Sequence, residues 1–173
     1  QGAMALLELD AAAAEELIAG YPDLTVAVYA SPHQTVVAGP PDQVDAVIAV
    51  VDSQERLARR VDVDVASHHP IIDPILDNLR AELAVLQPRQ PTIPIIVTTD
   101  ERPTDGSCVF DAEHWAANLR NPVRFARAVA TGGAEHALFV EVSPHPLLGY
   151  AIKDTLAESH HRSLATLQRS AND

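Results

Sequence analysis

The feature that most constrains the fold of this chain is an alternation of strand-like and helix-like hydrophobic patterns within its first sixty residues. Residues 4–9 and 24–30 are short, largely apolar runs, which is typical of strands. Between them, Asp10 can cap a helix and Gly20 can end it, because glycine adopts the left-handed conformation of a helix C-terminus without strain. The first thirty residues therefore predict a strand, a helix and a second strand.

A further strand and helix continue the same unit. After a turn, residues 34–38 form a strand, and Pro40 and Pro41 open a helix, where proline is tolerated because the first helical N–H groups have no partner. Four apolar residues of this helix share one helical face: Val44, Val47, Ile48 and Val51. With a strand from Leu57, the order β-α-β-β-α-β predicts a ferredoxin-like subdomain over residues 1–62.

Residues 63–173 alternate strands and helices, which indicates an α/β layer. Val61, Val63 and Val65 alternate with aspartates, so a strand with one apolar and one acidic face is expected there. The predicted strands are residues 61–65, 93–98, 137–142 and 164–167. The predicted helices run from Pro70 to about Leu86, around Trp115, from Asn121 and Pro122 to Gly132, and from Pro146, with an exposed loop at 99–109. The fold class is α/β (α+β), in two subdomains.

Charge and composition exclude several classes of protein. The net charge is −12, and no run of lysine or arginine is longer than Arg59-Arg60, so we expect neither nucleic acid nor an anionic membrane as a partner. Cys108 is the single cysteine, which excludes an intramolecular disulfide and a cysteine-rich zinc site and fits a cytoplasmic location. No apolar run approaches the roughly 18 residues that cross a bilayer. The first residues lack a signal-peptide pattern, and we expect the chain to begin inside a larger protein.

His68 is the strongest candidate for a catalytic group. It stands between the predicted 61–65 strand and a helix, where the scaffold can hold a side chain at the edge of a crevice. An imidazole with a pKa near 6.5 can act there as a general base; the alternative is a histidine that caps the helix or fills a gap. The pairs His68-His69 and His160-His161 make poor chelates because neighbouring side chains diverge, so no metal site is predicted.

The residues alone supply no nucleophile for that base. The sequence has no G-x-S-x-G turn of the kind that exposes a catalytic serine. Ser67 precedes His68 directly, and adjacent side chains leaving a strand point apart. Cys108 lies in a polar loop with no supporting pattern. The chain therefore offers a base without its partner.

Several motifs follow one another along nearly the whole chain. Residues 65–68 read VASH, residues 111–125 read DAEHWAANLRNPVRF, and residues 139–148 read FVEVSPHPLL. In this order they resemble the C-terminal half of the acyltransferase domain of modular type I polyketide synthases. The resemblance is strongest to the lipid-building synthases of the phthiocerol and mycocerosic type.

The resemblance implies a Ser-His mechanism. A serine attacks an acyl-CoA, and the acyl group then passes to the phosphopantetheine thiol of an acyl carrier protein. His68 would be the general base and later the acid, with its ring oriented by the backbone carbonyl of Asn121. Ser67 and Val65 would contact the substrate: the family has Phe at the Ser67 position for malonyl units and Ser for methylmalonyl, so methylmalonyl is favoured, although Val65 replaces the Tyr usual in the methylmalonyl motif. No cofactor is expected to bind this chain.

The resemblance also implies what this chain lacks. The serine elbow, the arginine that pairs with the extender carboxylate and the glutamine-bearing oxyanion loop belong to the family's N-terminal half. We therefore expect the chain to be inactive alone, to expose apolar surface within residues 61–173, and to pair with that half, with an acyl carrier protein and with neighbouring domains such as a ketosynthase. The large subdomain would be α/β-hydrolase-like. The alternative is a non-catalytic ferredoxin-like module for docking or ligand sensing.

Three other features have structural interpretations. Residues 143–146 (SPHP) predict a rigid strand-to-helix turn, and Trp115 and Phe125 are expected to pack between elements. Asp62 and Asp64 are expected on a solvated strand face. None of these residues is expected to take part in chemistry.

Overall fold

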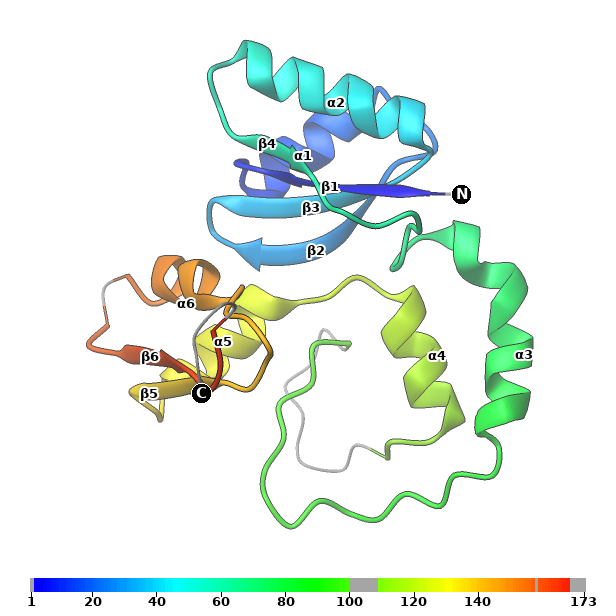
Figure 1. The fold of residues 1–173 in the computed structure, drawn as a ribbon, viewed down its shortest axis with the longest axis vertical. Helices are drawn as coiled ribbons and strands as arrows, with labels where there is room; N and C mark the ends of the chain where they lie inside the picture. The colour runs from blue at the N-terminus through cyan, green and yellow to red at the C-terminus, as the bar shows by residue number, and fades with distance from the viewer. Residues whose placement is uncertain (1, 100–108, 158, 169–173) are drawn as a thin grey trace.

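The N-terminal unit is an antiparallel sheet covered on one face by two helices (Figure 1). The computed structural model describes residues 2–99, 109–157 and 159–168. The elements of this unit are β1 (Ala3–Leu7), α1 (Ala11–Ile18), β2 (Thr25–Ser31), β3 (Gln34–Gly39), α2 (Pro41–Ser53) and β4 (Ala58–Arg60). The strand order is β2-β3-β1-β4. This confirms the predicted β-α-β-β-α-β subdomain.

Strand β1 places apolar residues on both faces of the sheet of this unit. Ala3, Ala5 and Leu7 alternate onto one face and pack with α1 and α2, as the two-residue period of a strand requires. Met4 lies on the other face and packs with Ala66 from the chain segment that leaves the sheet. The sheet therefore has a helix-covered face and a second face turned toward the rest of the molecule.

The second half consists of a helix pair and a small parallel sheet packed on two helices. Its elements are the 3₁₀ turn η1 (Pro70–Ile72), α3 (Asp73–Leu83), α4 (Ala112–Arg120), α5 (Phe125–Gly133), β5 (Leu138–Glu141), α6 (Gly149–Thr155) and β6 (Arg162–Ala165). The sheet order is β5-β6, in parallel register. Val129, Ile152 and Leu156 form the core between α5 and α6. The expected mixture of strands and helices is confirmed, while the division at residues 62 and 63 stays a prediction.

The prediction of a strand over residues 61–65 is wrong. The N–H of Val61 donates to the carbonyl of Met4 at 2.9 Å, and the N–H of Val63 then turns back to Val61 at 2.8 Å. Gly2, just before β1, donates its N–H to the carbonyl of Asp64 at 3.2 Å. Residues 61–65 therefore make isolated hydrogen bonds with the start of the chain and no continuous ladder, and Val65 is 49% exposed. Valine and aspartate alternate as in a strand, but the turn at Val63 interrupts the pairing.

Two further predictions are corrected. Residues 93–98 form no strand, and Ile93 is 74% exposed, because no described strand lies beside this segment. The helix expected from Asn121 and Pro122 begins instead at Phe125, since the backbone of Val123 pairs in parallel with the edge of β2. Most of the predicted 99–109 loop, with Cys108, lies outside the described residues.

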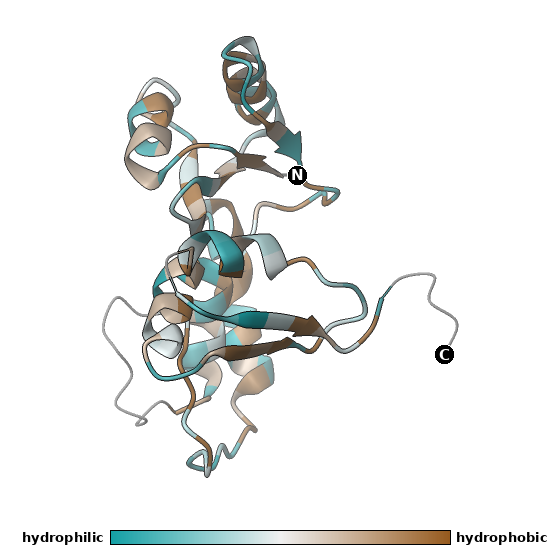
Figure 2. Cartoon of the chain, turned by 90° about the vertical axis from the view of Figure 1, so that its left-hand side faces the viewer, coloured by the Kyte–Doolittle hydropathy of each residue, from teal (hydrophilic) through white to brown (hydrophobic). Residues whose placement is uncertain are grey.

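Among the described residues, no helix or strand covers one face of the small parallel sheet. Leu138 and Val140 point to this face and are 57% and 51% exposed, and Figure 2 shows apolar segments in both strands. Parallel sheets in proteins are normally covered on both faces. The apolar surface expected in residues 61–173 is therefore present. Among the described helices, none combines the length and the apolar character needed to cross a membrane.

Gly39 allows a close backbone approach inside the N-terminal unit. A Cβ at this position would lie 2.5 Å from the carbonyl oxygen of Asp23, and its φ of +157° is one that side chains rarely adopt. Replacing Gly39 with Ala should therefore lower the free energy of unfolding by about 1–3 kcal/mol, measured by urea denaturation. Gly149→Ala is the matched control, because nothing lies within 4 Å of its Cβ position. Equal stability of the two variants would contradict this account of the Asp23 contact.

Candidate functional site

The segment Ser67-His68-His69-Pro70 sets the geometry of the site through its backbone. Proline disfavours the helical region for the residue before it, and His69 accordingly has φ −134° and ψ 150°. His68 takes a φ of +62°, a left-handed conformation that is uncommon for residues with a Cβ but less so for histidine. Such a conformation costs on the order of 1 kcal/mol or more, and persists only when its surroundings hold it.

The end of helix α4 holds His68 at two atoms. The last i to i−4 hydrogen bond of this helix joins the N–H of Asn121 to Ala117, so the carbonyls that follow lack helical partners. The backbone N–H of His68 donates to the carbonyl of Leu119 at 2.9 Å. Its ring Nδ1 lies 2.8 Å from the carbonyl oxygen of Asn121. A carbonyl can only accept, so Nδ1 carries the hydrogen of the neutral ring and the basic lone pair is on Nε2.

Two opposing effects set the protonation of His68. Partial burial lowers its pKa from the ordinary 6.5, and hydrogen bonds to the carbonyls of Asn121 and Asn118 raise it, with a net result below 6.5. Burial wins because it penalises the charged ring directly. The C-terminal end of a helix also favours positive charge. His68 is therefore neutral at pH 7, yet its surroundings can stabilise an imidazolium once a proton arrives.

His69 has the opposite character to His68. Its side chain is buried, at 7% exposed. Its Nε2 lies 2.7 Å from the carbonyl oxygen of Asp23 in the N-terminal unit, and its Nδ1 accepts the N–H of Ile71 at 3.0 Å. Both ring nitrogens are thus used in structural contacts. Sequence reasoning treated the two histidines as a pair; Pro70 was the available sign that the residue before it would cap the following turn.

Val65 and Ser67 lie just before His68 in the same segment. Ala66 between them is buried, and a Cβ on Gly2 would lie 2.5 Å from the Cβ of Ala66, so the start of β1 closes over the motif. Ser67 is partly buried beside His68, whereas Val65 is exposed. The catalytic role of His68 and the substrate roles of Ser67 and Val65 stay predictions.

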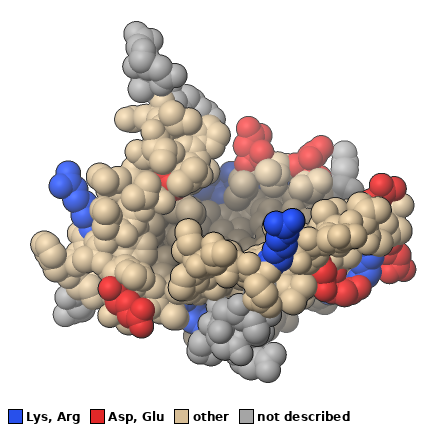
Figure 3. Space-filling model, turned by 90° about the horizontal axis from the view of Figure 1, so that it is seen from below, with Lys and Arg blue, Asp and Glu red and all other residues tan. Residues whose placement is uncertain are grey.

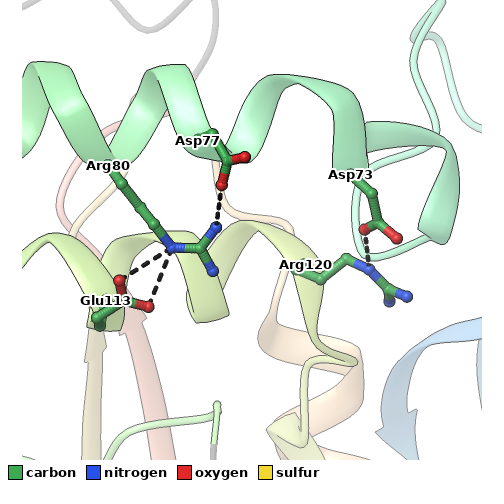
Figure 4. A network of polar contacts seen from close by, with 5 residues as sticks. All are labelled: Asp73, Asp77, Arg80, Glu113 and Arg120. Atoms are coloured by element: carbon green, nitrogen blue, oxygen red, sulfur yellow. Dashed lines mark hydrogen bonds and ion pairs between the residues drawn. The ribbon is translucent and has the colours of Figure 1, made fainter.

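A set of ion pairs fixes the helix whose end holds His68. Arg120, at the end of α4, pairs with Asp73 at the start of α3, and Arg80 bridges Asp77 and Glu113 at 3.1 and 3.0 Å (Figure 4). These exposed pairs each contribute little. The apolar contacts between the two helices contribute more, through Ile72, Leu76 and Ala116. Together they place the carbonyls of α4 beside the 67–70 segment.

The FVEVSPHPLL segment forms a turn built around one carboxylate. Glu141 accepts the N–H groups of Leu147 and Leu148 at 2.8 and 3.0 Å and the hydroxyl of Ser143 at 3.1 Å. Burial raises the pKa of Glu141, but these donors and the nearby His145 outweigh it and lower the pKa overall. The predicted turn between strand and helix is present, and helix α6 begins at Gly149 instead of Pro146.

The surface also has a hollow and a second pair of adjacent histidines. Seen from below, the molecule is hollowed near its middle, and most of the visible residues around the hollow are uncharged (Figure 3). Within the described residues, no three His, Cys, Asp or Glu side chains gather as metal ligands would. The pair His160-His161 lies in the loop before β6, with Nδ1 of His161 at 3.0 Å from the carbonyl of Ser159.

The sequence is similar to one family over its whole length. The profile of the acyl transferase domain matches residues 1–173. A phenolphthiocerol/phthiocerol polyketide synthase subunit of Mycobacterium tuberculosis (strain CDC 1551 / Oshkosh) is 62% identical over 170 residues, which are 98% of this chain and 9% of that protein. Another subunit of this synthase, from strain ATCC 25618 / H37Rv, is 51% identical over 185 residues, covering 100% of this chain and 12% of that protein. The chain therefore spans a small part of these relatives.

Solved structures show the same similarity. The acyltransferase domain of the polyketide synthase PpsC of Mycobacterium tuberculosis matches with a TM-score of 0.94 and 52% identity, covering 99% of this chain and 54% of that one. The acyltransferase domain of phenolphthiocerol/phthiocerol synthase A from Mycobacterium bovis (BCG) matches with a TM-score of 0.90 and 49% identity, covering 98% of this chain and 67% of that one. The malonyl CoA-acyl carrier protein transacylase of Coxiella burnetii, at 24% identity and a TM-score of 0.81, shares the fold.

The contacts of His68 predict its titration. Nitrogen-15 NMR of the imidazoles should show His68 with its hydrogen on Nδ1 at neutral pH and a titration midpoint below 6.5, because burial disfavours the charged ring. The His68→Ala variant assigns the signals. A midpoint at or above 6.5, or a hydrogen on Nε2 in the neutral ring, would contradict the geometry described.

Proposed function

This chain belongs to the acyl transferase domain family and is part of a polyketide synthase acyltransferase domain, and on that premise we propose that His68 is the general base of a Ser-His mechanism. The domain would load an extender acyl unit from its CoA thioester onto an acyl carrier protein. The observation that carries this proposal is the 2.8 Å contact between Nδ1 of His68 and the carbonyl of Asn121. It fixes the ring tautomer and leaves the basic lone pair on Nε2.

The chemistry follows from that tautomer. Nε2 of His68 removes the proton of a serine hydroxyl as its oxygen bonds to the thioester carbonyl carbon. The imidazolium formed is stabilised by the Asn121 carbonyl and by the C-terminal end of α4. It then gives the proton to the departing CoA thiolate, leaving an acyl-serine. In the second half, Nε2 takes the proton of the phosphopantetheine thiol and returns it to the serine when the acyl group moves.

The serine would come from a partner segment. The motifs of this chain match the C-terminal half of the family domain, and the chain spans 54% of the length of the solved PpsC domain. The apolar face of β5 and β6, with Leu138 and Val140 exposed, supports docking of the other half, since parallel sheets are normally covered on both faces. We infer that the chain alone is inactive. An acyl carrier protein, neighbouring domains such as a ketosynthase and a cytoplasmic location stay part of this proposal.

The alternative of a non-catalytic docking or sensing module accounts for less. A ferredoxin-like unit would explain residues 1–62, but it assigns no role to the left-handed His68 or to its contact with Asn121. A residue held in an unfavourable conformation at an exposed helix end points to a functional constraint. The geometry therefore favours the acyltransferase.

Complementation tests the role of His68. Mixing this chain with a separately produced N-terminal half of the PpsC acyltransferase domain should restore loading of the acyl carrier protein, followed by intact-protein mass spectrometry. His68→Ala in the mixture should lower the rate by about 10²-fold to 10⁴-fold, the usual loss when a general base is removed. The control is His161→Ala, in the loop before β6. Full loading by the His68→Ala mixture would end the assignment.

Ser67 carries the proposed preference for methylmalonyl. In the same mixture, Ser67→Phe should reduce methylmalonyl loading relative to malonyl by about 10-fold or more, because the ring would fill the space of the α-methyl and a methyl group alone is worth about 10–200-fold in discrimination. Ser67→Ala keeps the space and is the control. An equal loss with both thioesters would place Ser67 outside the acyl pocket.

A further inference from the structure

We propose that His69 is a positioning residue for His68: through contacts at both of its ring nitrogens, it holds the 67–70 backbone so that the ring of His68 meets the Asn121 carbonyl. The functional value of this arrangement rests on the proposed role of His68. The effect of His69 on the orientation of the His68 ring does not depend on catalysis, so NMR and kinetics test the positioning role and the proposed function separately.

The hydrogen bonds of His69 give its two ring nitrogens different roles. Nδ1 accepts the N–H of Ile71 at 3.0 Å, and Nε2 lies 2.7 Å from the carbonyl oxygen of Asp23. An atom that accepts from an N–H cannot carry a hydrogen, and an atom facing a carbonyl must carry one. His69 is therefore neutral, with its hydrogen on Nε2. Both nitrogens of a buried ring are satisfied, so the ring has one orientation.

The Asp23 carbonyl is itself a fixed point. The N–H of Asp23 donates to Oε1 of Gln43 in α2 at 3.3 Å, and Nε2 of Gln43 donates back to the Asp23 carboxylate at 2.9 Å. Gly39 packs against the same carbonyl, with no room for a side chain. The position of His69 is thus fixed relative to α2 and β3 of the N-terminal unit. A flexible loop carbonyl could not serve this purpose.

The contacts that hold His68 on its two sides come from different parts of the molecule. On one side, its N–H is bound to Leu119 at the end of α4. On the other, the residue that follows it is bound to Asp23 and to the first turn of η1. The left-handed φ of His68 lies between these two anchors. Removing the His69 contacts leaves one anchor, so the backbone can relax and Nδ1 can leave the Asn121 carbonyl.

Three substitutions separate the contacts. His69→Ala removes both; His69→Asn keeps an acceptor close enough to cap Ile71 but is too short to reach Asp23; His69→Gln can still donate toward Asp23. Nitrogen-15 NMR of this chain should show the neutral His68 ring of the Ala variant as a mixture of Nδ1–H and Nε2–H forms. Its titration midpoint should fall below that of the wild type, because the lost hydrogen bond to the Asn121 carbonyl is one that raises the pKa. The Asn and Gln variants should lie between Ala and the wild type. His161→Ala is the control that leaves the His68 signals unchanged.

The same variants have a kinetic consequence. In the complemented mixture they should lower kcat for loading, by as much as about 10²-fold when the ring is displaced by 1 Å, with KM for the acyl-CoA unchanged. If the Ala variant does not fold, as judged by amide dispersion, the Asn and Gln variants carry the test. A folded variant whose His68 keeps Nδ1–H and its midpoint overturns the positioning role. If instead His68→Ala retains full loading, the proposed function fails while the positioning geometry stands.

Discussion

The contact between the imidazole of His68 and the carbonyl of Asn121 is the interaction on which the remaining features of the site depend. It uses a carbonyl that helix α4 leaves without a helical partner, and it fixes the ring hydrogen on Nδ1. In the proposed mechanism, a backbone carbonyl takes the place that a carboxylate has in a Ser-His-Asp triad. This carbonyl cannot be protonated and carries no full charge. The partly buried ring stays neutral at pH 7, as the proposed role of general base requires.

This contact exists because the two halves of the chain are joined at several points. Val123, two residues after Asn121, pairs its backbone with Ala27 and Tyr29 on the edge of β2. The Arg124 guanidinium lies 5.1 Å from the centre of the Tyr29 ring, and the ring Nδ1 of His33 pairs with Asp154 of α6 at 2.8 Å. The ferredoxin-like unit thus acts as a support that places the end of α4 beside the 67–70 segment. Its sheet is built from local periodicity, and its second face is the surface on which the site is assembled.

The second half of the chain exposes apolar surface, and the chain covers only part of the domain that it matches. Two parallel strands with exposed Leu138 and Val140 leave apolar surface in water, at a cost of about 25 cal/mol for each Å² that a complete layer would bury. The chain spans about half of the PpsC domain, and the apolar face of β5 and β6 is where additional elements of an α/β layer would stabilise it.

By itself, the sequence determined the N-terminal unit and the identity of the central imidazole. Strand and helix periods there are local properties. The position of His68 after a strand-like run made it a candidate base, and the resemblance of the surrounding motifs to a known family pointed to Asn121 as its partner. Only the tertiary structure decided features that depend on a neighbour distant in sequence. Residues 61–65 have strand-like composition but make only isolated hydrogen bonds with Gly2 and Met4, and residues 93–98 have no adjacent strand among the described residues. Val123 delays helix α5 because β2 pairs with its backbone, and His69 is structural because the carbonyl of Asp23 lies 2.7 Å from its ring. Hydrogen-bond partners of this kind are set by packing, and no periodicity along the chain encodes them.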